Sequence, residues 1–154
     1  MNDFEVRRAR DDELERVVRL RWLWTLERGQ DPGDEQRYVR DASAWAREHS
    51  QTHLPHVAIG PDGAVLGMAW LALTPRVATT TSLNRVSGDL QSCYVLPEAR
   101  RAGVGSALVA AVLATARELG AEHVTVHATD DGARLYERGG FRVDPLLLWA
   151  DLRT

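Results

Sequence analysis

The chain has 154 residues, 44% of them hydrophobic and 27% charged, and its formal net charge of −3 argues against a general nucleic-acid partner. A single cysteine excludes an intrachain disulfide and a cysteine-based metal cluster. The longest apolar run, residues 107–116, is too short to span a membrane, so we expect one cytoplasmic domain over residues 1–154 without a membrane partner.

The first third of the chain predicts one strand and two helices. Apolar and charged side chains alternate over residues 4–9, which indicates a short strand. Apolar residues recur at three- and four-residue spacing over 12–28, the pattern of an amphipathic helix, and Gly29 ends it. A second helix is expected over residues 34–49.

The middle of the chain predicts a hairpin and a central strand. Residues 54–60 and 64–73 read as strands joined by the turn Pro61-Asp62-Gly63. The polar, threonine-rich residues 74–87 are expected to form a long loop. Residues 88–96 then form the central strand.

The last third predicts two more helix–strand pairs. A helix over 103–119 precedes a strand over 122–128, and a short helix over 130–138 precedes a final strand over 141–153 that Pro145 could break. The order β-αα-ββ-β-α-β-α-β contains one parallel crossover. It predicts an α/β fold with a mixed sheet and helices on both faces.

The residues between the central strand and the long helix have the features of an anion site. They read Arg100-Arg101-Ala102-Gly103-Val104-Gly105-Ser106. The first amides of a helix have no partner within the helix, and the helix dipole adds positive charge there. Glycines let an anion approach the backbone, and arginines add full charges. The segment predicts a phosphate-binding loop, with a plain strand-to-helix turn as the alternative.

This segment resembles motif A of the GNAT acetyltransferases, a loop with the pattern Arg/Gln-x-x-Gly-x-Gly/Ala that binds the pyrophosphate of acetyl-CoA. Arg100, Gly103 and Gly105 fall on that pattern. Residues 133–141 resemble the segment that closes the GNAT core, where a tyrosine precedes a Gly-Phe pair. The resemblance covers almost the whole chain. It implies the GNAT fold, with a mostly antiparallel sheet, and an acetyl-CoA-dependent N-acetyltransferase.

The resemblance also implies which residues contact acetyl-CoA. The loop contributes the backbone amides of Arg101, Ala102, Val104 and Ser106 beside the three motif residues. The backbone of Cys93, Tyr94 and Val95 falls where the family pairs a splayed strand with the pantetheine arm. Thr129 stands where the family often has an asparagine that contacts the cofactor, but a hydroxyl cannot supply an amide contact.

Two residues are candidates for the chemistry. The resemblance gives Tyr136 the role of general acid, which stabilises or protonates the CoA thiolate, although core packing is the alternative for its ring. Asp89 stands four residues before Cys93, where histone-type relatives carry the carboxylate that accepts the amine proton. Aspartate is one methylene shorter than the family's glutamate, so a water relay would be needed. Other candidate bases are Glu27, Asp130 and His127.

Acceptor specificity in the family comes from the first two helices and from a long loop between strands. Here that implies Arg21, Trp22, Trp24 and Trp45, together with the loop over residues 74–87. The acceptor is expected to be a small-molecule or peptide amine, and the acidic net charge favours a cationic one. A homodimer is possible, as in relatives, and no metal is expected because the histidine spacing fits no zinc motif.

Two other functions remain to be weighed. A dinucleotide-binding unit would need a third glycine where Leu108 stands, and the turn before the helix is too long. A non-catalytic acyl-CoA-binding or interaction module with the same fold stays open. All 19 basic residues are arginine, which is typical of a GC-rich bacterial genome and leaves no lysine for a Walker motif or a Schiff base.

Overall fold

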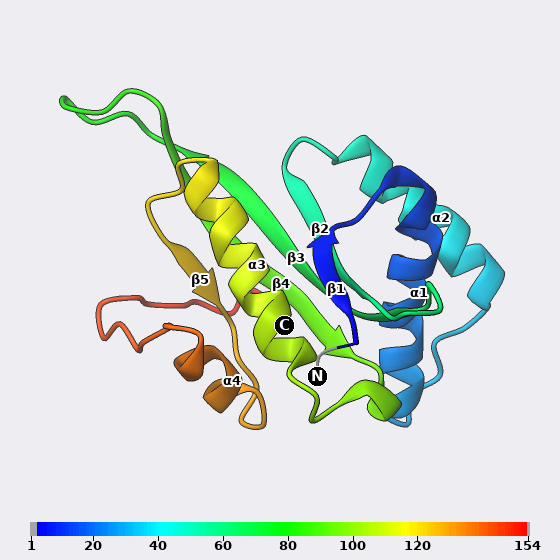
Figure 1. Ribbon diagram of the computed structural model, residues 1–154. Coiled ribbons are helices and arrows are strands. Elements are labelled where there is room, and N and C mark those ends of the chain that lie inside the picture. Colours follow the sequence, from blue (N-terminus) through cyan, green and yellow to red (C-terminus); the bar gives the residue numbers. More distant parts are fainter. Residues whose placement is uncertain (1–2, 154) are drawn as a thin grey trace.

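A five-stranded sheet forms the centre of the computed structural model, which describes residues 3–153 of the chain (Figure 1). The strands follow the order of the sequence: β1 (Glu5–Arg8), β2 (His53–Ile59), β3 (Val65–Arg76), β4 (Arg85–Val95) and β5 (Val124–Val126). Neighbouring strands are antiparallel except β4 and β5, which are parallel. The predicted α/β fold with a mixed, mostly antiparallel sheet is therefore confirmed.

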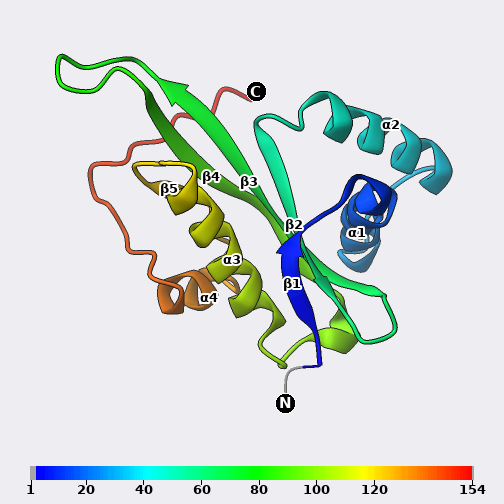
Figure 2. The same cartoon turned by 45° about the horizontal axis from the view of Figure 1, so that its top comes forward.

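Helices cover both faces of this sheet. They are α1 (Leu14–Glu27), α2 (Glu35–Glu48), α3 (Val104–Glu118) and α4 (Ala133–Arg138), with short 3-10 turns η1 (Asp11–Glu13) and η2 (Pro97–Ala99). Figures 1 and 2 show α3 and α4 on one side of the sheet and α1 and α2 on the other. None of the helices in the described part of the chain is long and apolar enough to cross a membrane.

The two faces bury separate cores, which explains the apolar composition of the central strands. On β3, Ala69 and Leu71 pack toward Leu108 and its neighbours on α3. Met68, from the opposite face of the same strand, packs toward Val17 on α1. All five side chains are fully buried.

A buried histidine joins the sheet to α3. His56 on β2 is 1% exposed, and its Nε2 lies 2.7 Å from the hydroxyl of Thr115 on α3. Its Nδ1 lies 3.1 Å from the carbonyl of Leu54. Burial lowers the pKa of His56 to about 4, so the ring is neutral at pH 7. A neutral ring can donate to the carbonyl and accept from the hydroxyl at once, which satisfies both nitrogens.

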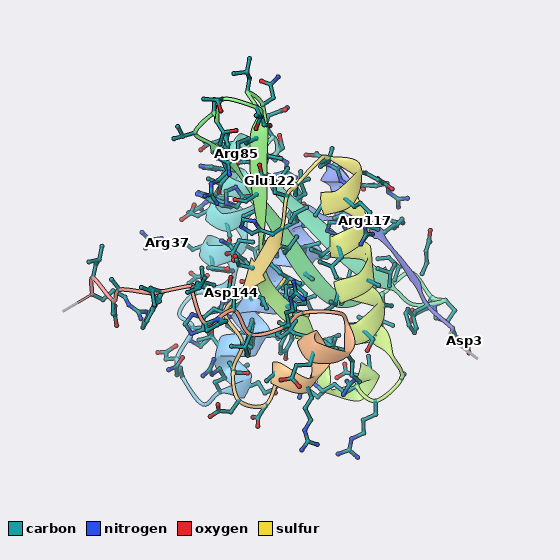
Figure 3. The ribbon with its side chains drawn as sticks, turned by 90° about the vertical axis from the view of Figure 1, so that its left-hand side faces the viewer. Asp3, Arg37, Arg85, Arg117, Glu122 and Asp144 are labelled. Atoms are coloured by element: carbon teal, nitrogen blue, oxygen red, sulfur yellow. The ribbon has the colours of Figure 1, made fainter. Side chains whose placement is uncertain are left out.

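The loop predicted over residues 74–87 is shorter than expected: residues 77–84 connect β3 to β4, whereas residues 74–76 and 85–87 belong to those two strands. β3 and β4 continue to pair through Thr74↔Ser87 and Arg76↔Arg85 and project beyond the sheet (Figure 1). The threonines at positions 79–81 lie in the remaining loop, where the Thr79 hydroxyl accepts from the amide of Ser82 at 3.1 Å. At its base, Arg85 binds Glu122 with an Nε–Oε1 distance of 2.7 Å (Figure 3).

The expected final strand over residues 141–153 is wrong. The described residues of this segment contain only a turn at Asp144, where the amide of Leu147 donates to the Asp144 carbonyl. Beyond that turn the described chain pairs with no strand, and Leu148 is 88% exposed (Figures 2 and 3). The apolar composition of this segment favours a strand. A strand also needs a neighbouring strand to pair with its backbone groups, and this segment pairs with none.

The histidine generates a pH prediction for stability. Between pH 6.5 and 4 the unfolded chain binds a proton at His56 that the folded chain does not, so the free energy of unfolding falls as pH falls through this window. The loss should approach about 3 kcal/mol, from a lowering of the pKa by more than two units. Urea unfolding at several pH values measures it.

The variant His56→Gln should be less stable than the wild type at pH 7 and should lack most of this pH dependence. His123→Gln, at an exposed histidine, is the matched control and should keep the wild-type profile. A pH profile that is the same in His56→Gln and in the wild type would contradict the assignment.

Candidate active site

A bulge in β4 changes the direction of its side chains in the middle of the sheet. Gln91 pairs with Trp70 and Tyr94 pairs with Met68, so two residues of β4 lie opposite one residue of β3. Ser92 takes up this extra length with a φ of 55°. As a result, Gln91 and Tyr94 both face the α1 side of the sheet, whereas Cys93 between them packs against the α3 core.

β5 stops pairing with β4 directly before this bulge. The parallel ladder consists of Gly88↔Val124, Asp89↔Thr125 and Leu90↔Val126. Within the described chain, residues 91–95 of β4 have no strand partner on the β5 side. After β5 the chain leads away to α4 (Figure 1). We call the opening between residues 91–95 and the end of β5 the wedge. The backbone groups at this edge have no strand partner on the β5 side, although the Val95 carbonyl accepts from Nε of Arg100.

Tyr136 lies at this wedge, against the thiol of Cys93. Burial, then the neighbouring thiol, raise the pKa of Tyr136 well above its ordinary value. Burial also raises the pKa of Cys93 to about 11, and it outweighs the hydrogen bond with the Tyr136 hydroxyl, which acts to lower that pKa. Both groups are therefore protonated at neutral pH. Phe141 packs edge-on against the Tyr136 ring with centroids 5.7 Å apart, which fixes the ring.

A close contact between α3 and α4 places the tyrosine. A Cβ atom at Gly139 would lie 2.8 Å from Cγ1 of Val109 on α3, so only glycine lets the end of α4 approach this closely. Thr129 shapes the turn before α4, since its hydroxyl oxygen accepts from the amide of Gly132 at 3.2 Å. That hydroxyl can still donate one hydrogen bond of its own.

The predicted phosphate-binding loop has the backbone that an anion cradle requires. Gly103 adopts a φ of 85° immediately before α3, and Arg101 also has a positive φ of 66°. No atom lies within 4 Å of the position where Gly103 would carry a Cβ, so the backbone is open there. Val104, Gly105 and Ser106 form the first turn of α3, whose amides lack partners within the helix.

Arg100 is held away from this cradle by a carboxylate on α1. Its Nη2 donates to both oxygens of Glu27 at 2.8 and 3.0 Å, and its Nε donates to the carbonyl of Val95 at 2.9 Å. The Tyr94 hydroxyl donates to the same carboxylate at 2.6 Å. Arg100 and then Tyr94 lower the pKa of Glu27. We call these three side chains, Glu27, Tyr94 and Arg100, the clamp.

Because Arg100 belongs to the clamp, Arg101 is the arginine of this loop that is available to an anionic ligand. Among the ion pairs and side-chain hydrogen bonds of residues 3–153, none includes Arg101, and its side chain is exposed. Burial, then Glu27, raise the pKa of Tyr94 to about 12, so its hydroxyl remains a donor. The Tyr94 side chain points to α1 rather than into the wedge.

Asp89 lies at the last paired positions of β4, on the same face as Gln91. Its carboxylate accepts from the hydroxyl of Thr125 at 2.6 Å and from the side-chain amide of Gln91 at 2.9 Å. The other candidate bases are differently placed. Glu27 belongs to the clamp, and His127 meets the edge of Trp149 with ring centroids 5.5 Å apart.

A cavity of about 290 Å³ lies between α1, α2 and the sheet, and it borders the bulge. Its lining consists of Val18, Arg21, Tyr38, Ala42, Trp45, His53, Met68, Trp70, Gln91 and Ser92. Arg21 and Trp45 were predicted for the acceptor from the sequence. Two other predicted residues lie elsewhere: the Trp22 indole donates to the carbonyl of Gly33, and Trp24 stacks on Tyr94.

The remaining lining residues were not singled out for the acceptor by the sequence. Tyr38 belongs to the apolar face of α2. Trp70 faces the cavity because side chains alternate between the two faces along β3. Their aromatic side chains were a signal, but core packing explained them equally well. No group of three or more metal-ligating side chains is assembled within residues 3–153.

Comparison with known proteins gives one family. A family model described as "Acetyltransferase (GNAT) family" matches residues 14–141. Among curated proteins, an aminoglycoside N(6')-acetyltransferase type 1 from Klebsiella aerogenes is 44% identical over 64 residues. That match covers 42% of this chain and 41% of the relative, so less than half of the relative's length is represented.

Solved structures share the whole fold. A predicted acetyltransferase with acetyl-CoA from Clostridium acetobutylicum has a TM-score of 0.77 and 16% identity, over 97% of this chain and 96% of its own. A GCN5-related N-acetyltransferase from Ralstonia eutropha JMP134 has a TM-score of 0.72 and 25% identity, over 96% and 98%. At such identities the likeness establishes the fold, which agrees with the resemblance found in the sequence.

The clamp generates a prediction about the mobility of the loop. Glu27→Gln removes the charge that holds Arg100, so we expect faster amide hydrogen exchange over residues 97–103. The effect on the free energy of unfolding should stay near 1 kcal/mol, because the paired side chains are 37% and 43% exposed. Glu98→Gln, which neutralises an exposed carboxylate within the same segment, is the control. Equal exchange in both variants would show that the clamp does not order the loop.

Proposed function

The chain belongs to the GNAT acetyltransferase family, and from this membership we propose that it transfers an acetyl group from acetyl-CoA to a primary amine. The observation that carries the proposal is the wedge beside the bulge of β4, with a protonated Tyr136 at it. Unpaired strand backbone can bind an extended pantetheine arm, and the phenol can meet a leaving sulfur. The amine is proposed to attack directly while both substrates are bound.

The residues of the cradle and the wedge fit acetyl-CoA. The open backbone at Gly103 and the first-turn amides of α3 would receive the pyrophosphate, with Arg101 as the available guanidinium. The backbone of residues 93–95 would pair with the pantetheine arm. When bound, acetyl-CoA supplies a thioester with an electrophilic carbonyl carbon.

Chain residues act at both ends of the transfer. A primary amine has a pKa near ~10, so it must lose a proton before its nitrogen forms a bond to the carbonyl carbon. Asp89 would accept that proton through water, on the face where the cavity borders Gln91. As the carbon–sulfur bond breaks, the sulfur takes the electron pair. The Tyr136 hydroxyl would donate its hydrogen bond or its proton to that sulfur.

Removal of the phenol tests the chemical role. Tyr136→Phe should lower kcat by about 100-fold, because the donor to the leaving sulfur is lost. The dissociation constant of acetyl-CoA should change less than about threefold, because the ring and its packing on Phe141 remain. Single-turnover kinetics isolates the chemical step. An unchanged single-turnover rate in Tyr136→Phe would rule out the assigned role.

Calorimetric titration with acetyl-CoA tests the cosubstrate directly, with NAD as the negative control. Arg101→Ala should weaken binding about tenfold, since a charge-assisted contact to phosphate is lost. Arg117→Ala is the matched control, because Arg117 lies in the last turn of the same helix (Figure 3). Its affinity should equal that of the wild type.

The outcomes separate the possible functions. If acetyl-CoA does not bind, the proposal fails. If it binds but no amine in a broad panel releases free thiol, the non-catalytic acyl-CoA-binding module is supported instead.

A further inference from the structure

The cavity beside the bulge has a charge pattern that selects among amine acceptors. We infer that it accepts a compact primary amine with an aromatic body and a carboxylate, for which L-phenylalanine is the simplest model. This inference rests on the proposed acetyl transfer and names the class of acceptor for it.

Aromatic side chains give the cavity its shape. Tyr38 and Trp45 come from α2, and Trp70 comes from β3. A volume of about 290 Å³ is modest, since an engineered cavity of roughly 150 Å³ already binds benzene. It therefore suits one ring or a fused pair of rings with a short side chain. Stacking between flat faces would hold such a ring.

Charge in the lining comes from one cation. Arg21 lines the cavity, and no aspartate or glutamate is among the lining residues. Its guanidinium lies over the Trp24 ring, 4.3 Å from the centroid, and takes part in no ion pair within residues 3–153. The other ionisable lining residues favour their neutral forms, because burial lowers the pKa of His53 and raises the pKa of Tyr38. A guanidinium without a carboxylate partner in the described chain is well suited to bind the carboxylate of a ligand.

The part of the lining that comes from β4 suits an amine. Gln91 and Ser92 line the cavity at the bulge, and the Gln91 amide is bonded to the carboxylate of Asp89. An amino acid could therefore place its carboxylate toward Arg21 and its amine toward the bulge, next to the wedge. The site would be complementary to a zwitterion.

A polycationic acceptor fits this cavity poorly. Aromatic faces attract cations, but Arg21 would repel them, and no lining carboxylate would compensate several ammonium groups. The aminoglycoside relative does not decide the matter. Its match covers 64 residues, whereas the lining extends from Val18 to Ser92, a longer stretch than that match can contain.

The test compares three acceptors by the release of free thiol from saturating acetyl-CoA. They are L-phenylalanine, phenethylamine, which lacks the carboxylate, and kanamycin, which carries several amines. We expect kcat/KM for L-phenylalanine to exceed that for phenethylamine at least tenfold and that for kanamycin at least 100-fold. The new amide carbon–nitrogen bond replaces the thioester carbon–sulfur bond in each case.

The variant Arg21→Gln tests whether Arg21 is the source of the preference for an acceptor with a carboxylate. Arg21→Gln should lower kcat/KM for L-phenylalanine at least tenfold more than for phenethylamine. Arg37→Gln, an exposed arginine on α2 outside the cavity lining, should keep the wild-type ratio (Figure 3). Circular dichroism would check that both variants are folded. Equal losses for the two acceptors in Arg21→Gln would overturn the role of Arg21.

The test separates this inference from the proposed function. If the wild type binds acetyl-CoA and acetylates kanamycin or phenethylamine at least as well as L-phenylalanine, acetyl transfer stands and the inference is wrong. The inference is also wrong if acetyl-CoA binds and none of the three amines is acetylated. If acetyl-CoA does not bind at all, the proposed function itself fails.

Discussion

The end of the hydrogen-bond ladder between β4 and β5 is the constraint on which the candidate site depends. The ladder stops at Leu90↔Val126, and the bulge at Ser92 follows on β4. Had the two strands continued to pair, their backbone groups would satisfy one another and no wedge would exist. The bulge also sends Cys93 to the α3 side and Gln91 to the α1 side. Two faces of the sheet thereby meet at one opening.

Contacts distant in sequence hold this opening in place. The clamp ties the end of α1 to the loop before α3, through the shared carboxylate of Glu27. The His56–Thr115 hydrogen bond ties α3 to β2 on the other side. Gly139 lets α4 pack against Val109, which sets the position of Tyr136. Each contact restrains a different edge of the site, so rigidity is distributed rather than supplied by one core.

The sequence predicted what depends on local residues and missed what depends on distant ones. The start of α3 at Gly103 and the positions of the helices follow from local patterns. The pairing of residues 74–76 with 85–87 and the path beyond Asp144 depend on whether another strand is in reach, which no local pattern records. The same holds for Arg100. Its place in the motif indicates an anion ligand, but its side chain binds Glu27, 73 residues away.

Net charge is a poor guide to acceptor specificity for a similar reason. The chain is acidic, yet many of its carboxylates are neutralised by arginines, as in the pairs Arg7–Glu13, Arg47–Glu15, Arg19–Glu35 and Arg85–Glu122. The lining of the cavity between α1, α2 and the sheet instead includes Arg21, which forms no ion pair with a carboxylate of the described chain. A ligand interacts most strongly with charges that are close to it and unpaired. An ion pair exerts a much weaker field, because its two opposite charges largely cancel. The local charge therefore favours an anionic group on the acceptor even though the whole chain is negative.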